Sequence, residues 1–195
     1  MGLYRSIRLT QLAVNSNFVN GTDRWAGYNS TISIEGDDLK CVGTGGSNYV
    51  GFRSTPTGDA ALPLSISGHK YFFKAKGRVF DASVGDIRLF ASGSILDTGF
   101  AVATPAGSGN WVYPSGIYTA DASVLLHVYC SARYADAATA VNKEFFTDYI
   151  ICYDLTAIFG AGNEPSAAWC RVNLPVFFEG SIGIGRRFGG IGGLR

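Results

Sequence analysis

Residues 144–166 read EFFTDYIICYDLTAIFGAGNEPS, and this stretch divides the chain into two parts of different character. Its first ten residues are almost continuously apolar or aromatic, which is typical of a strand buried on both faces. Asp154 then suits a helix N-cap, followed by one short helical turn. Gly160 and Gly162 can take positive φ and end that turn, and Pro165 suits the start of a second short helix. The stretch therefore predicts a last strand followed by a helix–break–helix corner.

The chain before this corner reads as short β segments separated by tight turns. Thirteen Phe and ten Tyr, against a single Met, favour strands over a helix bundle, and 26 Gly supply the turns. Alternating or apolar runs recur at the spacing of a β-sandwich, and they lie at residues 31–35, 39–42, 49–53, 71–80, 87–91, 99–103, 111–118, 123–132 and 144–153. Together they predict an all-β sandwich of about nine or ten strands in two sheets. We assign residues 15–153 to this sandwich, residues 1–14 to an extended lead and residues 154–180 to the corner.

The composition limits the class of protein. Hydrophobic residues make up 47% of the chain and charged residues only 16%, which excludes a disordered chain and predicts that partners cover part of the surface. A net charge of +1 predicts no nucleic-acid partner. The sequence offers no apolar run long enough to cross a bilayer and no signal-peptide core, so we expect no membrane insertion.

Four cysteines are too widely spaced to predict a zinc site, and they are Cys41, Cys130, Cys152 and Cys170. Two of them lie in apolar, strand-like runs, where a thiol behaves as a small hydrophobic group. We therefore expect free buried thiols, with a disulfide as the alternative.

The corner offers no reaction chemistry on its own. Glu164 is its only acid besides Asp154, and no histidine lies near it in the sequence. Acid–base catalysis needs a second group, so we interpret the corner as structural and expect the protein not to be an enzyme. The corner residues with a predicted structural role are Asp154, Phe159, Gly160, Gly162, Asn163, Glu164 and Pro165.

Several motifs resemble known families. NSNFVNGTDRW at residues 15–25 resembles the N-x-x-F-x-x-G-x-x-x-W opening of jelly-roll carbohydrate-binding modules and of related sandwiches in bacteriophage tails. GHKYFFKAKG at residues 68–77 and FTDYI at 146–150 resemble an inner strand and the closing strand of the same modules. DLTAIFGAGNEP at residues 154–165, with the Pro-aromatic step LPVFFEG after it, resembles a segment that follows a sandwich in many phage tail and baseplate proteins. The resemblance implies a jelly-roll fold.

The phage part of the resemblance implies a structural virion protein of the tail, baseplate, fibre or head decoration. It would be made in the bacterial host cytoplasm, and its partners would be copies of itself and other virion proteins. Residues 181–195 are rich in glycine, so we expect them to be disordered alone and to form an assembly arm held by a neighbouring subunit. The candidate arm residues are Ile182, Ile184, Arg186, Arg187, Phe188, Ile191, Leu194 and Arg195.

The alternative function is a glycan-binding module that contributes to adhesion to a host cell-surface glycan. Aromatic faces pair with the C–H faces of sugars, and the candidate platform comprises Trp25, Tyr28, Tyr49, Trp111 and Tyr113. Jelly-roll modules often hold a structural calcium ion through an acid on the last strand, which makes Asp148 a candidate ligand. An ion pair or a capped turn is the alternative role for Asp148, and no other cofactor is expected.

Overall fold

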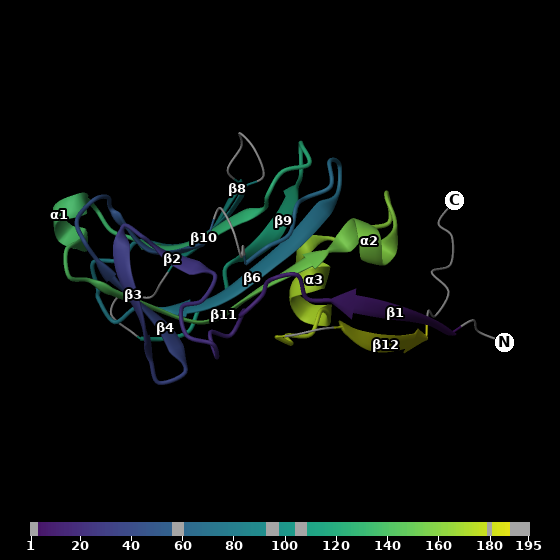
Figure 1. The fold of residues 1–195 in the computed structure, drawn as a ribbon, viewed down its shortest axis with the longest axis horizontal. Coiled ribbons are helices and arrows are strands. Elements are labelled where there is room, and N and C mark those ends of the chain that lie inside the picture. Colours follow the sequence, from purple (N-terminus) through teal and green to yellow (C-terminus); the bar gives the residue numbers. More distant parts are fainter. Residues whose placement is uncertain (1–3, 56–60, 93–97, 104–108, 179–180, 188–195) are drawn as a thin grey trace.

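The computed structural model describes residues 4–55, 61–92, 98–103, 109–178 and 181–187. Ten of its strands form two five-stranded antiparallel sheets that pack face to face (Figure 1). We name each sheet after its central strand. The β10 sheet has the order β2 (Trp25–Tyr28), β5 (Tyr49–Ser54), β10 (His127–Arg133), β7 (Asp86–Ser92) and β8 (Thr98–Ala103). The β11 sheet has the order β3 (Ser30–Glu35), β4 (Asp38–Gly43), β11 (Glu144–Asp154), β6 (Lys70–Arg78) and β9 (Ser115–Thr119).

The strand order is that of a jelly roll. From β4 to β11 the chain crosses between the sheets at every connection except the β7–β8 hairpin, which stays within one sheet. This places β4-β11-β6-β9 against β5-β10-β7-β8, the two four-stranded layers of a jelly roll. β2 and β3 then add one strand to each layer. The predicted jelly-roll β-sandwich is confirmed, and the Ala-rich segment after β10 forms one helical turn, α1 (Ala137–Ala140).

The main core lies between the sheets and follows the two-residue period of the strands. On β10, Val128, Cys130 and Ala132 point inward and are buried. Phe18 and Trp25 pack edge-to-face on each other and on Phe52, so the two aromatics of the opening motif lie in the core. All four cysteines are free and buried, as expected.

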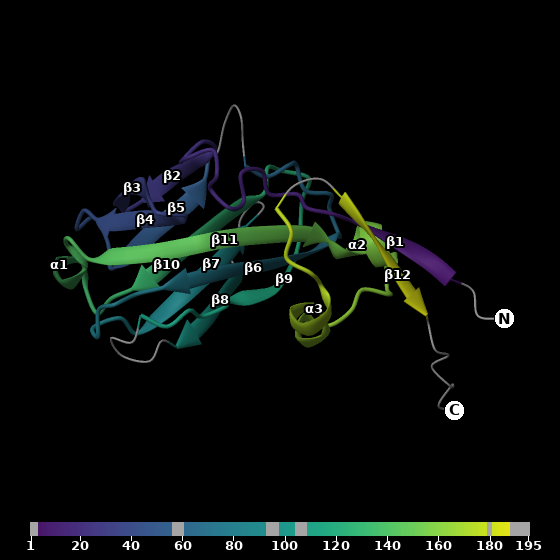
Figure 2. The same ribbon diagram turned by 90° about the horizontal axis from the view of Figure 1, so that it is seen from below.

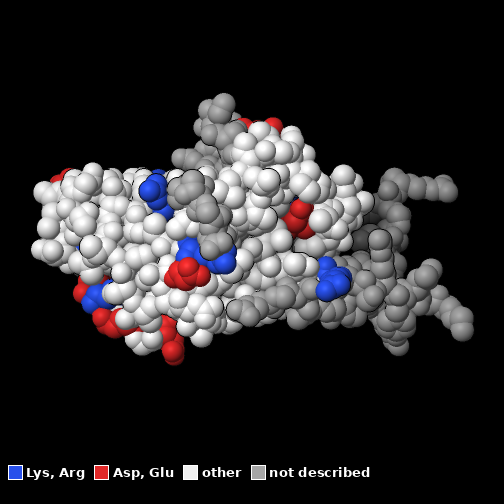
Figure 3. All heavy atoms as spheres, viewed as in Figure 1, with Lys and Arg blue, Asp and Glu red and all other residues white. Residues whose placement is uncertain are grey.

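Charged groups are sparse on the surface. On the face shown in Figure 3, most of the described surface is neither acidic nor basic, and the charged side chains form small scattered groups. Within the part of the chain that the structure describes, no helix has the length and apolar character needed to span a bilayer.

The helix–break–helix corner is confirmed, with one correction. α2 (Leu155–Phe159) is capped by Asp154, whose carboxylate accepts from the Ala157 N–H, and Gly160 and Gly162 follow it with φ of 88° and 80°. The second helix, α3 (Ala167–Asn173), does not begin at Pro165, because the Ser166 hydroxyl accepts from the Trp169 N–H and makes Ser166 the N-cap.

The corner packs back onto the outer face of the β11 sheet and creates a second core (Figure 2). Phe72, Ile151 and Tyr153 point outward from the sheet, yet they are fully buried. The segments that cover them contribute Leu9, Leu155, Cys170 and Leu174. The corner is therefore part of the folded domain rather than a joint outside it.

The N-terminal lead is also built into the fold. The Leu12 N–H donates to the Cys152 carbonyl and the Ile150 N–H donates to the Ser16 carbonyl, so this segment runs beside the distal half of β11. The Gln11 side chain accepts from the Cys152 N–H at 2.8 Å in the same place. Part of the extended lead at residues 1–14 therefore lies beside β11, beyond the end of β4.

The two ends of the described chain pair with each other. β1 (Tyr4–Thr10) and β12 (Ser181–Arg187) form an antiparallel two-stranded ribbon at the end of the sandwich where α2 and α3 lie (Figures 1 and 2). The expectation that the arm is disordered alone is wrong for Ser181–Arg187, since the chain's own first strand supplies its hydrogen-bonding partner. The remaining arm residues lie outside the described residues, and they are Phe188, Ile191, Leu194 and Arg195.

Candidate functional site

The structure does not bring the five predicted platform aromatics together. Trp25 is buried in the core with 4% of its surface exposed, so its assignment to a glycan platform is wrong. Trp111 and Tyr113 lie near β6 on the outer side of the β11 sheet, where Lys76 and Lys74 approach their rings. Only Tyr28 and Tyr49 share a site, on the outer face of the β10 sheet.

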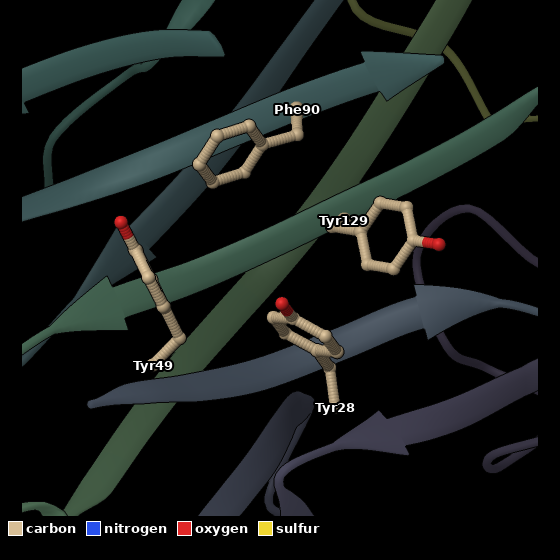
Figure 4. Close-up of a pocket in the computed structure, with 4 residues that line it drawn as sticks. All are labelled: Tyr28, Tyr49, Phe90 and Tyr129. Atoms are coloured by element: carbon tan, nitrogen blue, oxygen red, sulfur yellow. The ribbon is translucent and has the colours of Figure 1, made fainter. Parts of the chain in front are cut away.

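That site is an open cleft with four aromatic walls, supplied by four adjacent strands of the β10 sheet (Figure 4). Its walls are Tyr28 from β2, Tyr49 from β5, Phe90 from β7 and Tyr129 from β10. The cleft has a volume of about 260 Å³, close to the lower end of the range of small-molecule sites. A cleft of this size suits one small ring or the end of a chain of them.

Strand alternation explains why these four side chains point outward. On β10, Tyr129 lies between the inward Val128 and Cys130, and on β7 Phe90 lies between the inward Leu89 and Ala91. Cross-strand pairing then places Tyr129 directly opposite Phe90.

The rings form two edge-to-face pairs, one on each side of the cleft. The centroids of Tyr28 and Tyr129 are 5.0 Å apart, and those of Tyr49 and Phe90 are 6.0 Å apart. Such pairs hold each ring in a defined orientation. The walls of the cleft are therefore ordered without a ligand.

The middle of this ring of aromatics contains small side chains. Gly51 lies opposite both Tyr28 on β2 and Ser131 on β10. The outer face of the sheet between the aromatic rings therefore carries only a glycine and a serine side chain. The Ser131 side chain is fully buried, and its Oγ has no hydrogen-bond partner. A buried hydroxyl without a partner is uncommon in proteins and needs an explanation.

Charged groups border the cleft on the Tyr49 side. Arg88 binds Asp86 through two hydrogen bonds of 2.8 and 3.2 Å, and Arg133 contacts the same carboxylate at 2.8 Å. The Asp86 hydrogen bond raises the pKa of Arg88. Arg88 also reaches across β10 to the Tyr49 hydroxyl, at 3.4 Å. The Asp86 contacts hold the Arg88 side chain beside the Tyr49 ring.

The corner contains a histidine–carboxylate contact that the sequence analysis missed. His69 Nδ1 lies 2.8 Å from Asp154 Oδ2, although 85 residues separate the two in the sequence. No histidine is close to the corner in the sequence, but the fold brings His69 into contact with it. The other oxygen of Asp154 caps α2, so both oxygens have structural partners.

Glu164 ties the break between α2 and α3 to the sandwich. It accepts hydrogen bonds from the Thr156 hydroxyl at 2.7 Å, the Gly162 N–H at 3.0 Å and Lys70 at 3.2 Å. The Thr156 hydroxyl is the main cause that lowers the pKa of Glu164 to about 2. The predicted structural role of the corner agrees with these contacts.

Asp148, the candidate calcium ligand, is ion-paired with Lys76 at 2.5 Å. It lines a second cleft together with Asp37 and Asn17, whose buried Oδ1 has no hydrogen-bond partner. Among the described residues, no cluster of three His, Cys, Asp or Glu side chains is arranged to hold a metal ion. Lys76 already neutralises the one acid of β11 in this cleft, so the ion-pair alternative describes Asp148 in this structure.

Sequence reasoning found half of the aromatic cleft. Phe90 and Tyr129 were missed, because the runs at residues 87–91 and 123–132 were assigned to strands without separating the two faces of each strand. The alternation of the two strands contains the information that identifies them. Small or aliphatic residues occupy the inward positions of β7 and β10, so the large aromatic residue of each strand points outward.

Comparisons with known proteins support the fold. No protein-family model matches the chain, and no curated protein sequence matches it. Among solved structures, the chain is similar to an arabinose-bound α-L-arabinofuranosidase, with a TM-score of 0.59 and 14% identity. This match covers 83% of the chain but only 29% of the enzyme's length.

Matches to isolated modules cover nearly their whole length. The C-terminal family 22 carbohydrate-binding module of a Clostridium thermocellum xylanase gives a TM-score of 0.50 at 14% identity, over 76% of this chain and 93% of the module. A xylan-binding domain of the same family gives 0.50 at 14% identity, over 78% and 95%. At such identities the comparisons show a β-sandwich like that of carbohydrate-binding modules. The bacteriophage part of the resemblance stays a prediction.

Proposed function

We propose that this chain is a non-catalytic glycan-binding module that binds sugar in the aromatic cleft of the β10 sheet. The observation that carries the proposal is the set of four partly exposed aromatic rings on one sheet face, arranged around Gly51 and Ser131. Four large aromatic side chains clustered on the outer face of one sheet need an explanation, because exposed rings do not contribute to the core that stabilises the sandwich.

The chemistry of the cleft fits a carbohydrate. Sugar rings present apolar C–H faces and polar hydroxyl edges, so they need both aromatic surface and hydrogen-bonding groups. Tyr28, Tyr49 and Tyr129 each provide a ring together with a hydroxyl, and Arg88 provides donors beside Tyr49. The edge-to-face contacts hold the rings before binding, which lowers the entropy cost of forming the complex.

The fold is consistent with this proposal. The sandwich is similar to that of carbohydrate-binding modules, and one of the similar structures is a xylan-binding domain. The likeness is one of fold, so the choice of sugar has to come from the cleft itself.

The experiment is a glycan array followed by titration calorimetry on the best ligand. We expect saturable binding that falls at least about tenfold in Tyr129→Ala, the size expected for losing a central aromatic contact. Tyr113→Ala is the matched control, because Tyr113 is 47% exposed on the other sheet. Its affinity should equal that of the wild type. Absence of saturable binding to every glycan, or equal losses in both variants, would refute the proposal.

A second candidate is an assembly role in a bacteriophage virion, and the β1–β12 ribbon favours it. Among the described strands, β1 and β12 pair only with each other. Such two-stranded ribbons are marginally stable alone and can accept a further strand along an edge. We expect that removing residues 181–195 leaves the sandwich folded but prevents incorporation into particles. Normal incorporation of the truncated chain would exclude this role.

A further inference from the structure

We infer that the sugar bound in the aromatic cleft carries an anionic group, and that Arg53 is the residue that binds it. The anionic group is a carboxylate, as in a uronic or sialic acid, or a sulfate ester with similar oxygen geometry. This inference rests on the proposed glycan function and specifies the chemical class of ligand.

Arg53 lies on the same outer face as the four aromatics. Its inward neighbours on β5 are Phe52 and Ser54, both fully buried, so the Arg53 side chain points away from the core. Strand pairing places it directly opposite Tyr129 on β10 and Ala26 on β2. It therefore lies beside Tyr129, one wall of the cleft, and two rows along the strands from Asp86.

The charge on this face is unbalanced. The outward positions of β5, β7 and β10 carry three arginines and one aspartate. Asp86 is fully engaged, because Arg88 binds both of its oxygens and Arg133 shares one of them. In the described part of the chain, Arg53 has no ion pair with any acid, and its Nε is buried without a hydrogen-bond partner.

An unpartnered guanidinium beside aromatic rings favours an acidic ligand. The Nε–H and one Nη–H of arginine are parallel donors that match the two oxygens of a carboxylate. A neutral sugar hydroxyl can accept only one of them. The neighbouring Ser131 Oγ is a second buried polar atom without a partner on this face, and it can bond to a sugar hydroxyl while Arg53 binds the acid group.

Both atoms lie below the solvent-accessible surface, so a ligand reaches them by displacing a side chain. For Ser131 the covering group follows from the register. Arg88 on β7 lies directly opposite Ser131 on β10. Its side chain reaches the Tyr49 hydroxyl on β5, so it crosses over β10 next to Ser131. Its 3.4 Å contact with Tyr49 is long for a hydrogen bond and is easily exchanged for a ligand contact.

The test compares ligands that differ only in charge. The full chain is titrated with oligogalacturonate and with its methyl ester, which has the same rings without the charge. Sulfated and sialylated glycans on an array distinguish the two sources of the anionic group. We expect at least tenfold tighter binding of the acid form than of the ester, and a preference that weakens as salt is raised.

Two substitutions at Arg53 connect the preference to this residue. In Arg53→Gln the acid form should bind no better than the ester, and in Arg53→Lys the preference should be intermediate, because lysine keeps the charge without the parallel donors. Arg171→Gln is the matched control, since Arg171 is exposed on α3. Thermal melting of each variant confirms that it is folded, and Arg53→Lys carries the test if Arg53→Gln does not fold.

The outcomes separate the inference from the proposed function. A preference for acidic or sulfated sugar that is lost in Arg53→Gln supports the inference and identifies the group. Equal affinity for acid and neutral forms, or a preference unchanged in Arg53→Gln, overturns the inference and leaves glycan binding intact. Binding of no sugar at all overturns both.

Discussion

Replacing Leu155 with alanine tests whether the corner is an integral part of the domain. Leu155 is the first residue of α2, is fully buried and belongs to the second core on the β11 sheet. Truncating a buried leucine removes apolar contacts and leaves a cavity, at a cost of about 2–5 kcal/mol in the free energy of unfolding. Because short helices can relax toward a cavity, we expect about 2–3 kcal/mol.

Such a loss is a large fraction of the stability of an ordinary domain, which is about 5–15 kcal/mol. For a domain of this size it should lower Tm by about 4–12 °C in a thermal unfolding scan. Val172→Ala is the control, since Val172 lies on α3 and is 83% exposed. This change should alter the free energy of unfolding by less than about 0.5 kcal/mol.

The alternative is a corner that acts only as a joint between the sandwich and the arm. In that case α2 would detach locally in Leu155→Ala, and the sandwich would unfold at the temperature of the wild type. A Tm change below about 2 °C, or a separate early transition without a shift of the main one, would refute the packing argument.

Three further predictions concern single contacts. Tyr153→Phe removes the 2.7 Å hydrogen bond from the Tyr153 hydroxyl to the Pro175 carbonyl and should cost about 1 kcal/mol, measured by urea unfolding. Glu164→Gln should reduce the pH dependence of stability: the folded pKa of Glu164, about 2, lies below its ordinary 4.5, so the wild type gains stability above pH 4.5 that it loses as the pH falls toward 2. A variant whose Tm falls as steeply as that of the wild type over this pH range would contradict this. Millimolar calcium should leave Tm unchanged, because Lys76 occupies the Asp148 carboxylate, whereas a rise in Tm would show that the ion is bound.

Much of the fold could be predicted from local patterns. Alternation, glycine-marked turns and the Asp154 cap depend on neighbouring residues, and each was placed close to its position in the structure. The paired aromatics Phe18 and Trp25 also occupy the core, as their motif indicates. These features depend on interactions between residues close in the sequence.

The aromatic cleft was predicted less well, because its composition depends on which sheet face each side chain points to. Trp25 and Tyr28 are three positions apart on β2, so they point to opposite faces, and only Tyr28 can reach the cleft. The partners of Tyr28 come from β5, β7 and β10, and the strand order that brings them together is a property of the whole topology. The contact between His69 and Asp154 was missed for the same reason.

The pairing of β1 with β12 could not be predicted from the sequence, for a different reason. Ser181–Arg187 contains glycine at alternate positions and has weak strand propensity, so its structure depends on a partner from the other end of the chain. The glycine content predicts a flexible backbone in this segment, but it does not indicate which strand would pair with it and order it.

The β1–β12 ribbon has a practical consequence for joining this sandwich to other proteins. Tyr4 lies opposite Arg187, so the polypeptide enters and leaves the domain through neighbouring residues (Figure 1). Opposed Cα atoms in an antiparallel pair are only about 4.5–5.5 Å apart, which is the spacing at the base of a β-hairpin loop. The whole sandwich can therefore be grafted into a surface loop of a carrier protein without separating the carrier's own strands. In such a chimera the ribbon becomes a stalk, and the aromatic cleft is displayed beyond it.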